Sequence, residues 1–170
     1  PVQSGSDRVL ARMKRKVTHA EYIQRIHWLR EAVHDMSIST DLIVGFPGES
    51  DEDFEQTMEL VKKSRFSFAY AFKYSPRKST AAIRFKDQVE ETIKSQRLEK
   101  LNKLLDQITL EENHKRIGQE SKTLFLYESK KDPGFYYGRD EHFRLVRVKS
   151  STNIIGQKLA TMIQSCNKTA

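Results

Sequence analysis

The sequence predicts an α/β protein in two parts, a set of parallel βα units followed by a small antiparallel β-barrel or sandwich. As far as residue 116, helical and strand patterns alternate in the order helix, strand, helix, strand, helix, which is the rhythm of parallel βα units. After Gly118 the pattern changes to short alternating segments separated by turn residues. We therefore expect a domain boundary near residue 117, with domains 1–117 and 118–170.

The first helix and strand have clear local signals. Thr18 and Glu21 have the spacing of a capping box ahead of an apolar stripe, which predicts a helix over residues 18–35. The following β-branched run ends at Val44 and is punctuated by the glycines and proline of "GFPG". This pattern predicts a buried strand that ends in a tight turn.

The next three elements follow from capping and periodicity. Ser50 with Asp53 predicts a second capped helix, and alternating aromatics over residues 66–74 predict a second strand. We expect those aromatics in the core rather than on a base-stacking surface, because a parallel strand is buried on both faces. A leucine stripe then predicts a long helix near residues 89–116.

Four short segments make up the second part. Their alternation, with Pro133, Gly134 and Gly156 between them, predicts antiparallel strands. The segments are "SKTLFLYES", "FYYGR", "FRLVRVKS" and "KLATMIQS".

Composition limits the classes of function. The net charge is +7, and residues 118–170 hold nine Lys/Arg against five Asp/Glu, which weakly favours an anionic partner. The only cysteine is Cys166, and no apolar run approaches the roughly 20 residues that a membrane span needs. The five histidines show no metal-ligand spacing. We expect a cytoplasmic protein without a metal site of its own or a membrane partner.

Loops at the carboxyl ends of the strands are the candidate ligand site, because ligands of parallel α/β layers bind there. The segments Gln3–Asp7, Gly45–Ser50 and Ser75–Thr80 have this position. Gly45 and Gly48 would let the backbone approach a ligand without a Cβ in the way, although "GFPG" could equally be a plain βα turn.

Two acidic residues near the strand end have open roles. Asp41 interrupts an apolar strand, so its carboxylate either finds hydrogen bonds or faces a cavity. Glu49 could orient a ligand hydroxyl or favour the helix N-terminus electrostatically, and the two roles are compatible.

Basic residues of the second part suggest a polyanion. Arg139, Arg144, Arg147 and Lys149 alternate with apolar residues, which would place them on one exposed face of a sheet. Such a face could contact phosphates or simply be solvated. Arg77 lies in a loop at the ligand-binding end of the first part.

Several motifs occur together and in one order: "PVQSGSD", "MKRKVT", "STDLIVGFPGESDEDFEQT", "FKYSPRKSTAA" and "QRLEKL". Together they resemble the radical S-adenosylmethionine methylthiotransferases, in particular the tRNA-modifying MiaB type. The segment "YGRDEHFRLVRV" is similar to the TRAM domain of that family, a small RNA-binding β-barrel. The resemblance covers the chain from end to end.

The resemblance implies a fold and an activity. Residues 1–117 would form the C-terminal half of a TIM-like (βα) radical SAM barrel, and residues 118–170 the TRAM barrel. The family cleaves S-adenosylmethionine on a 4Fe–4S cluster, and the resulting radical activates a substrate C–H bond, while a second 4Fe–4S cluster serves sulfur insertion. MiaB-type enzymes methylthiolate an isopentenylated adenosine beside the tRNA anticodon, so the implied partner is the anticodon stem-loop, not DNA.

The resemblance also implies site residues. Gln3 and Ser4 would lie near the polar groups of the cofactor and Arg15 near its methionyl end. The loop Ile43–Pro47, with Gly45 and Phe46, would contact adenine and ribose, together with Glu49 and the Tyr74 region. The implied RNA contacts are Arg77, Arg139, Arg144, Arg147 and Lys149.

One departure from the family is decisive for this chain. The CxxxCxxC motif and the further cluster cysteines are missing, and a single cysteine cannot ligate a 4Fe–4S cluster. We therefore expect a C-terminal fragment that binds no cluster and is inactive alone, in keeping with the proline at position 1. A half-barrel would expose strand edges, which predicts self-association.

Three alternatives stay open. The ribosomal-protein-modifying branch of the family resembles "YSPE" where this chain has "YSPR". The threonylcarbamoyl-adenosine branch usually resembles "HVFPYS" rather than "FAYAFKYS". A non-catalytic RNA-binding module is the alternative from another class.

Overall fold

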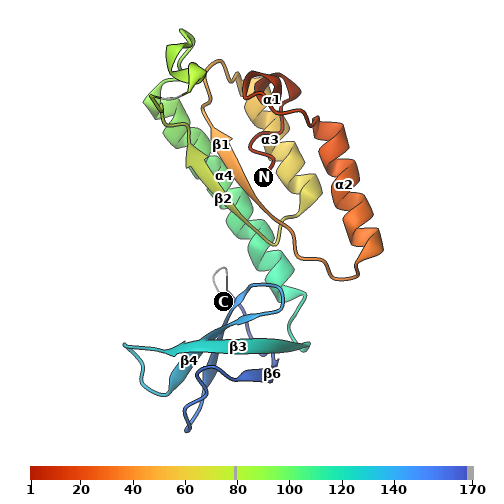
Figure 1. Ribbon diagram of the computed structural model, residues 1–170, viewed down its shortest axis with the longest axis vertical. Coiled ribbons are helices and arrows are strands. Elements are labelled where there is room, and N and C mark those ends of the chain that lie inside the picture. The colour runs from red at the N-terminus through yellow and green to blue at the C-terminus, as the bar shows by residue number, and fades with distance from the viewer. Residues whose placement is uncertain (79, 168–170) are drawn as a thin grey trace. The chain divides into compact units, whose positions relative to one another are not determined.

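A computed structural model describes residues 1–78 and 80–167 (Figure 1). The chain divides into two compact units, Pro1–Thr109 and Leu110–Ala170. Their division falls inside a long helix, α4 (Glu91–His114), whereas the sequence places a boundary near residue 117. The assignment of the units to the two named domains stays a prediction.

The first unit has the element order that the sequence predicts, with two additions. The sequence patterns place two strands, β1 and β2, and three helices, α2, α3 and α4, at these positions. The short helices α1 and η1 were not predicted. β1 and β2 pair in parallel, and Gln3 adds an isolated parallel bridge to Leu42. The elements are α1 (Asp7–Arg12), α2 (His19–Ala32), β1 (Ser39–Val44), α3 (Asp51–Ser64), β2 (Phe68–Lys73), η1 (Ala81–Arg84) and α4.

Both predicted capping boxes are present. The Glu21 N–H donates to Thr18 Oγ1 at 3.2 Å, and the Thr18 N–H donates back to Glu21 Oε2 at 2.9 Å. At the start of α3 the Asp53 N–H donates to Ser50 Oγ at 3.2 Å and the Ser50 N–H to Asp53 Oδ2 at 2.8 Å. Each box satisfies amide groups that a helix start leaves without a partner.

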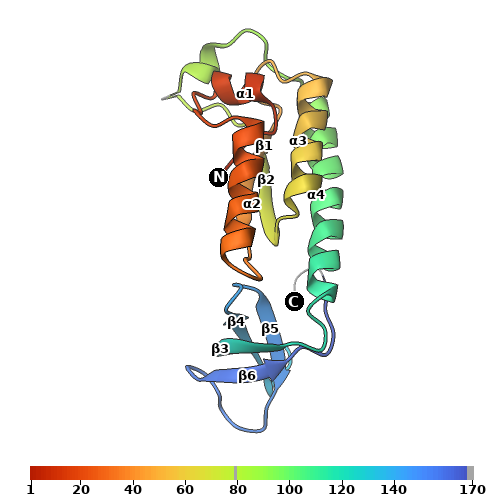
Figure 2. The same cartoon turned by 90° about the vertical axis from the view of Figure 1, so that its right-hand side faces the viewer.

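Helices cover one face of the two strands. Leu42 and Val44 of β1 are fully buried with apolar side chains of α2, α3 and α4, among them Ile26, Phe54 and Leu101. Figure 2 shows α3 and α4 running beside each other, and the Lys100–Glu55 ion pair joins them. This core fixes the strands, and with them the loops at their carboxyl ends.

The other face of the strands is largely open, which corrects the expectation for the aromatic residues of β2. Phe66 and Tyr74 are buried, but Tyr70 is 61% and Phe72 52% exposed. In the register, Tyr70 lies beside Asp41 and Phe72 beside Ile43. The expectation of two-sided burial was wrong for these side chains because helices pack on a single face of this sheet.

The second unit is a curled antiparallel sheet, and its four strands are those that the sequence predicts. The strand order is β5-β4-β3-β6, and Phe125, Tyr136 and Ile154 form its core. Within the described part of the chain, no helix has the length and apolar character to cross a membrane. The strands are β3 (Glu120–Glu128), β4 (Phe135–Asp140), β5 (Leu145–Lys149) and β6 (Lys158–Met162).

Candidate functional site

The loops that follow the strands of the first unit gather at one end of the sheet. The Gly48 N–H donates to the Asp87 carbonyl at 2.7 Å, and Arg12 of α1 pairs with the Asp87 carboxylate at 2.8 Å. Arg8 donates to the Gly48 carbonyl at 2.5 Å. Figures 1 and 2 both show α1 and the yellow-green turn of η1 at this end. The predicted loop Ser75–Thr80 includes Ser79, which lies outside the described residues.

An apolar cluster lies beneath these loops. Phe46 and Tyr74 are buried with their ring centroids 5.2 Å apart, edge to face, and Val9 of α1 completes the buried part. Ile43 packs against them from β1. The Tyr74 hydroxyl is buried and has no hydrogen-bond partner among the described residues. The structure thus brings together three side chains that the resemblance assigns to the cofactor, Ile43, Phe46 and Tyr74.

Glu49 closes the loop onto itself. Its buried carboxylate accepts the Gly45 N–H at 2.7 Å and a hydrogen bond from Arg97 Nη1, also at 2.7 Å. Arg97 comes from α4 and additionally donates to the Glu49 carbonyl and to Asp51. Burial raises the pKa of Glu49, and the Gly45 amide and Arg97 only partly oppose this. The second carboxylate oxygen, Oε1, is buried without a partner in the described structure.

Sequence reasoning missed Arg97 as part of this site. It lies 48 positions from Glu49, so neither periodicity nor capping connects the two residues. The only indication that Arg97 could matter was its position in the "QRLEKL" motif, to which we assigned no role.

The geometry of the loop glycines agrees with the second of the two interpretations of "GFPG", a tight βα turn. Gly45 and Gly48 have φ values of 70° and 80°, which favour glycine. A Cβ on Gly45 would lie 2.3 Å from Lys94 Cγ, and one on Gly48 would lie 2.4 Å from Asp87 Oδ2. The space beside both glycines is therefore filled by the chain's own side chains and is not left open to a ligand. Pro47 is buried between them.

The remaining predicted cofactor residues have different surroundings. Gln3 is buried beside β1, where its N–H donates to the Asp41 carbonyl at 3.0 Å and its carbonyl accepts the Ile43 N–H at 2.8 Å. Ser4 is fully buried, with its hydroxyl 3.3 Å from that of Thr57 in α3. Arg15 is exposed and follows α1, outside the apolar cluster of Phe46 and Tyr74.

Asp53 joins the starts of two helices. Besides capping α3, its carboxylate accepts a hydrogen bond from Ser6 Oγ at 2.5 Å and forms an ion pair with Arg8. Burial alone would raise the pKa of Asp53, but hydrogen bonds from Arg8, Ser6 and Ser50 outweigh it and hold the pKa far below its usual range. The carboxylate is thus ionised at neutral pH and fixes the N-terminal segment next to the loop.

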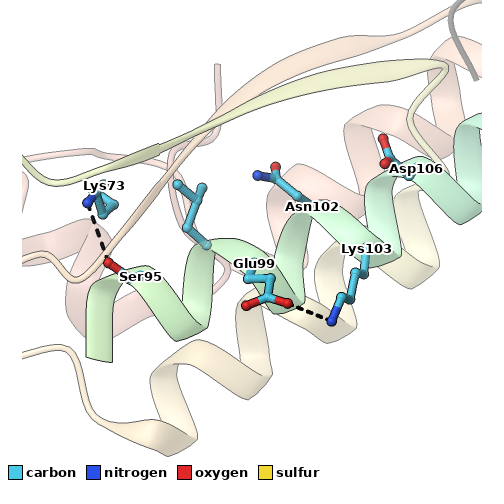
Figure 3. A pocket seen from close by; sticks show the side chains of 7 residues that line it. Lys73, Ser95, Glu99, Asn102, Lys103 and Asp106 are labelled. Atoms are coloured by element: carbon cyan, nitrogen blue, oxygen red, sulfur yellow. Dashed lines mark hydrogen bonds and ion pairs between the residues drawn. The ribbon is translucent and has the colours of Figure 1, made fainter. Parts of the chain in front are cut away.

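A groove of about 340 Å³ lies elsewhere in the first unit, along α4 and the end of β2. Figure 3 shows Lys73 pointing to Ser95 and Glu99 pointing to Lys103. None of the predicted cofactor residues lines it. The lining side chains are Lys73, Ser95, Leu98, Glu99, Asn102, Lys103 and Asp106.

The side chains of this chain do not fit an iron–sulfur cluster. Such a cluster needs several thiolate ligands, and Cys166 is the only cysteine. In the part of the chain that the structure describes, no group of three His, Cys, Asp or Glu residues could hold a metal ion.

The basic residues of the second unit do not all lie on one face of the sheet, contrary to the prediction from the sequence. Arg147 and Lys149 of β5 stand opposite Tyr137 and Phe135 of β4, and Arg139 shares their outer face. Arg144 does not, because it precedes β5 in the turn after β4, where it is half-buried and its N–H donates to Asp140 Oδ1 at 2.8 Å. The expectation of one face for all four was wrong for Arg144. In the first unit, Arg77 is exposed in its loop.

Comparison with known proteins agrees with these features. Residues 1–61 match the Radical SAM superfamily. The chain is 47% identical over 158 residues to the tRNA-2-methylthio-N(6)-dimethylallyladenosine synthase of Stutzerimonas stutzeri, covering 92% of this chain and 36% of that protein. The proteins of the same name from Pseudomonas aeruginosa and Pelotomaculum thermopropionicum are 47% and 39% identical, each over 92% of this chain and 35% of the relative.

The chain thus spans about a third of the length of the curated relatives that it matches. The superfamily match and the relatives together cover both units of the chain. The match of residues 1–61 and the 39–47% identity to these synthases support a MiaB-type assignment within the radical SAM superfamily.

Proposed function

We propose that this chain supplies the S-adenosylmethionine-binding loops and an RNA-binding module of a tRNA methylthiotransferase. The substrate would be N(6)-dimethylallyladenosine, the isopentenylated adenosine beside the anticodon, in cytoplasmic tRNA. Support comes from the names that the relatives carry and from their 39–47% identity over 92% of the chain.

The observation that carries the cofactor assignment is the loop after β1. Half-buried Ile43 lies beside the buried rings of Phe46 and Tyr74, and we assign this apolar cluster to packing against the adenine ring. Tyr74 Oη and Glu49 Oε1 are buried polar atoms without a partner among the described residues, and such atoms call for one. Gln3 and Ser4 would complete the site, and Arg15 would reach the methionyl end.

When bound, S-adenosylmethionine supplies the radical that activates the substrate C–H bond. The role of this chain is then to hold and orient that cofactor. Because the chain has one cysteine, we propose that residues of the enzyme other than these 170 ligate both 4Fe–4S clusters. Loading the purified chain with iron and sulfide should give no cluster absorbance above background.

The fold fits this role. We assign the segment around Gln3, which bridges to β1, together with β1 and β2 to the second half of a TIM-like barrel. Its interior side would be the open face that carries Tyr70 and Phe72. The curled sheet of the second unit would be the TRAM barrel, whose cations contact the anticodon stem-loop. Those contacts would include Arg77, Arg139, Arg144, Arg147 and Lys149.

Nucleoside analysis of tRNA tests the proposal. Deleting the gene should leave dimethylallyladenosine in place and remove its methylthio group, as measured by mass spectrometry. Loss of the methylthio group from a threonylcarbamoyl-adenosine or from a ribosomal protein would assign the chain to another branch of the family. Unchanged methylthiolation everywhere would favour a non-catalytic RNA-binding module.

A further inference from the structure

Two tyrosines stack on the outer face of the sheet in the second unit. The rings of Tyr127 and Tyr137 are 5.5 Å apart between centroids and 15° from parallel. Tyr127 is 50% exposed, and the core of the unit, with Phe125 and Tyr136, lies on the opposite face. The stacked pair is therefore a surface feature and contributes little to the core.

A β-bulge creates this pair. Phe125 pairs with Gly138, but the next pair is Tyr127 with Tyr137, so Leu126 is an extra residue in β3. Without the extra residue, Leu126 would stand opposite Tyr137, and Tyr127 would turn to the core side. Bulges commonly re-aim a side chain next to a functional surface. Here the bulge places a second aromatic ring on the face that already carries one.

Cations lie on the same face of the sheet as the tyrosine pair, since Arg147 stands opposite Tyr137 in the register. The Arg147 guanidinium lies 3.7 Å from the centre of the Phe135 ring, and Lys149 Nζ lies 5.9 Å from it. Arg139 lies over Phe143 at 5.1 Å. Asp132 pairs with Arg147 at 3.0 Å and offsets part of this charge. A surface of aromatic rings and cations complements a chain of bases and phosphates.

We infer that the aromatic face, defined as Tyr127, Tyr137, Phe135, Arg147 and Lys149, binds unpaired RNA bases by stacking while its cations hold the adjoining phosphates. This inference rests on the proposed function, which supplies RNA as the partner. An RNA duplex hides the faces of its bases, so it would leave the tyrosine rings without a role. The face therefore selects unpaired nucleotides, such as those of a loop, over a paired stem.

Fluorescence anisotropy with the 170-residue chain tests the inference. The probes are a labelled single-stranded RNA of about 12 mixed adenosine and uridine nucleotides and the same strand annealed to its complement. We expect the single strand to bind at least about tenfold more tightly. Tyr127→Ala should weaken single-strand binding by about 5- to 100-fold, since stacking contributes on this order per base, and Tyr127→Phe should not.

Salt dependence separates the two kinds of contact. Tyr127→Ala should leave the slope of log affinity against log salt unchanged, whereas Arg147→Gln should reduce it by about one phosphate contact. Trp28→Ala is the matched control, because Trp28 is an exposed aromatic residue of α2, outside the proposed cofactor and RNA sites, and should have no effect. Thermal unfolding of each variant checks that the sheet is intact.

Equal affinity for single strand and duplex, or full affinity in a folded Tyr127→Ala chain, would overturn the inference. Failure of the chain to bind either RNA at low salt would overturn it as well. In each of these cases the nucleoside analysis of tRNA still decides the proposed function separately.

Discussion

The guanidinium of Arg97, on α4, donates a hydrogen bond at 2.7 Å to the buried carboxylate of Glu49, which in turn holds the Gly45 amide. The proposed cofactor loop is therefore braced by a helix that begins more than 40 residues later. Removing one member of a buried ion pair leaves the other charge without compensation, which costs more than the pair itself contributes.

Arg97→Ala should therefore lower the free energy of unfolding of the first unit by about 3–5 kcal/mol. Urea unfolding followed by the fluorescence of Trp28, the only tryptophan, reports on this unit. The double variant Arg97→Met/Glu49→Gln should lose much less stability than Arg97→Ala, because it leaves no buried charge without a partner. A loss no larger than that of Arg25→Ala, at an exposed site, would contradict the bracing role.

Asp53 should make stability depend on acid pH. Its folded pKa is lowered, so its contribution is complete above the unfolded value of about 3.9 and is lost as the pH falls toward the folded value. Asp53→Asn should cost about 2–3 kcal/mol at pH 7. The difference from wild type should shrink below about pH 4 in urea unfolding. A difference that stays constant down to pH 2 would show that the charge is not responsible.

Gly45→Ala should destabilise the loop through two separable effects. The positive φ costs about 1–2 kcal/mol for alanine, and the added methyl group collides with Lys94. Repeating the substitution in a Lys94→Ala background should remove the second effect and leave the first. A double-mutant cycle from urea unfolding measures the coupling, and a value near zero would mean that Lys94 moves aside freely.

Tyr74→Phe should separate cofactor binding from stability. The Tyr74 hydroxyl is buried without a partner among the described residues, so its removal should leave the melting temperature unchanged or higher. In the full-length protein, the same change should weaken S-adenosylmethionine binding about 3- to 10-fold by calorimetry, the effect of one lost hydrogen bond. Lower stability with unchanged affinity would assign the hydroxyl a structural role.

The open face and outer edge of β2 should promote self-association of this chain. Tyr70 and Phe72 are exposed there, and β2 pairs with β1 alone in the described sheet. Sedimentation velocity should show dimers or larger species at high concentration, and Phe72→Lys should shift them toward monomer. Monomeric wild type under the same conditions would contradict this prediction.

The features that the sequence predicts correctly are local ones. The capping boxes at Thr18 and Ser50 need only four adjacent residues, and the strand and helix periods need one segment each. Exposure of Tyr70 was missed because the environment of a strand depends on which elements cover it. The Tyr127 position was missed because a bulge shifts the two-residue period without a local signal in the sequence.

Asp53 has one further consequence, for how the first unit folds. Ser6 caps α1 and Ser50 caps α3, and the same carboxylate accepts hydrogen bonds from both residues. A helix of six residues is too short to persist alone, so α1 depends on the first turn of α3 for its own start. The segment that carries Gln3 and Ser4 therefore belongs to one cooperative unit with α3, and it gains and loses its structure together with that helix.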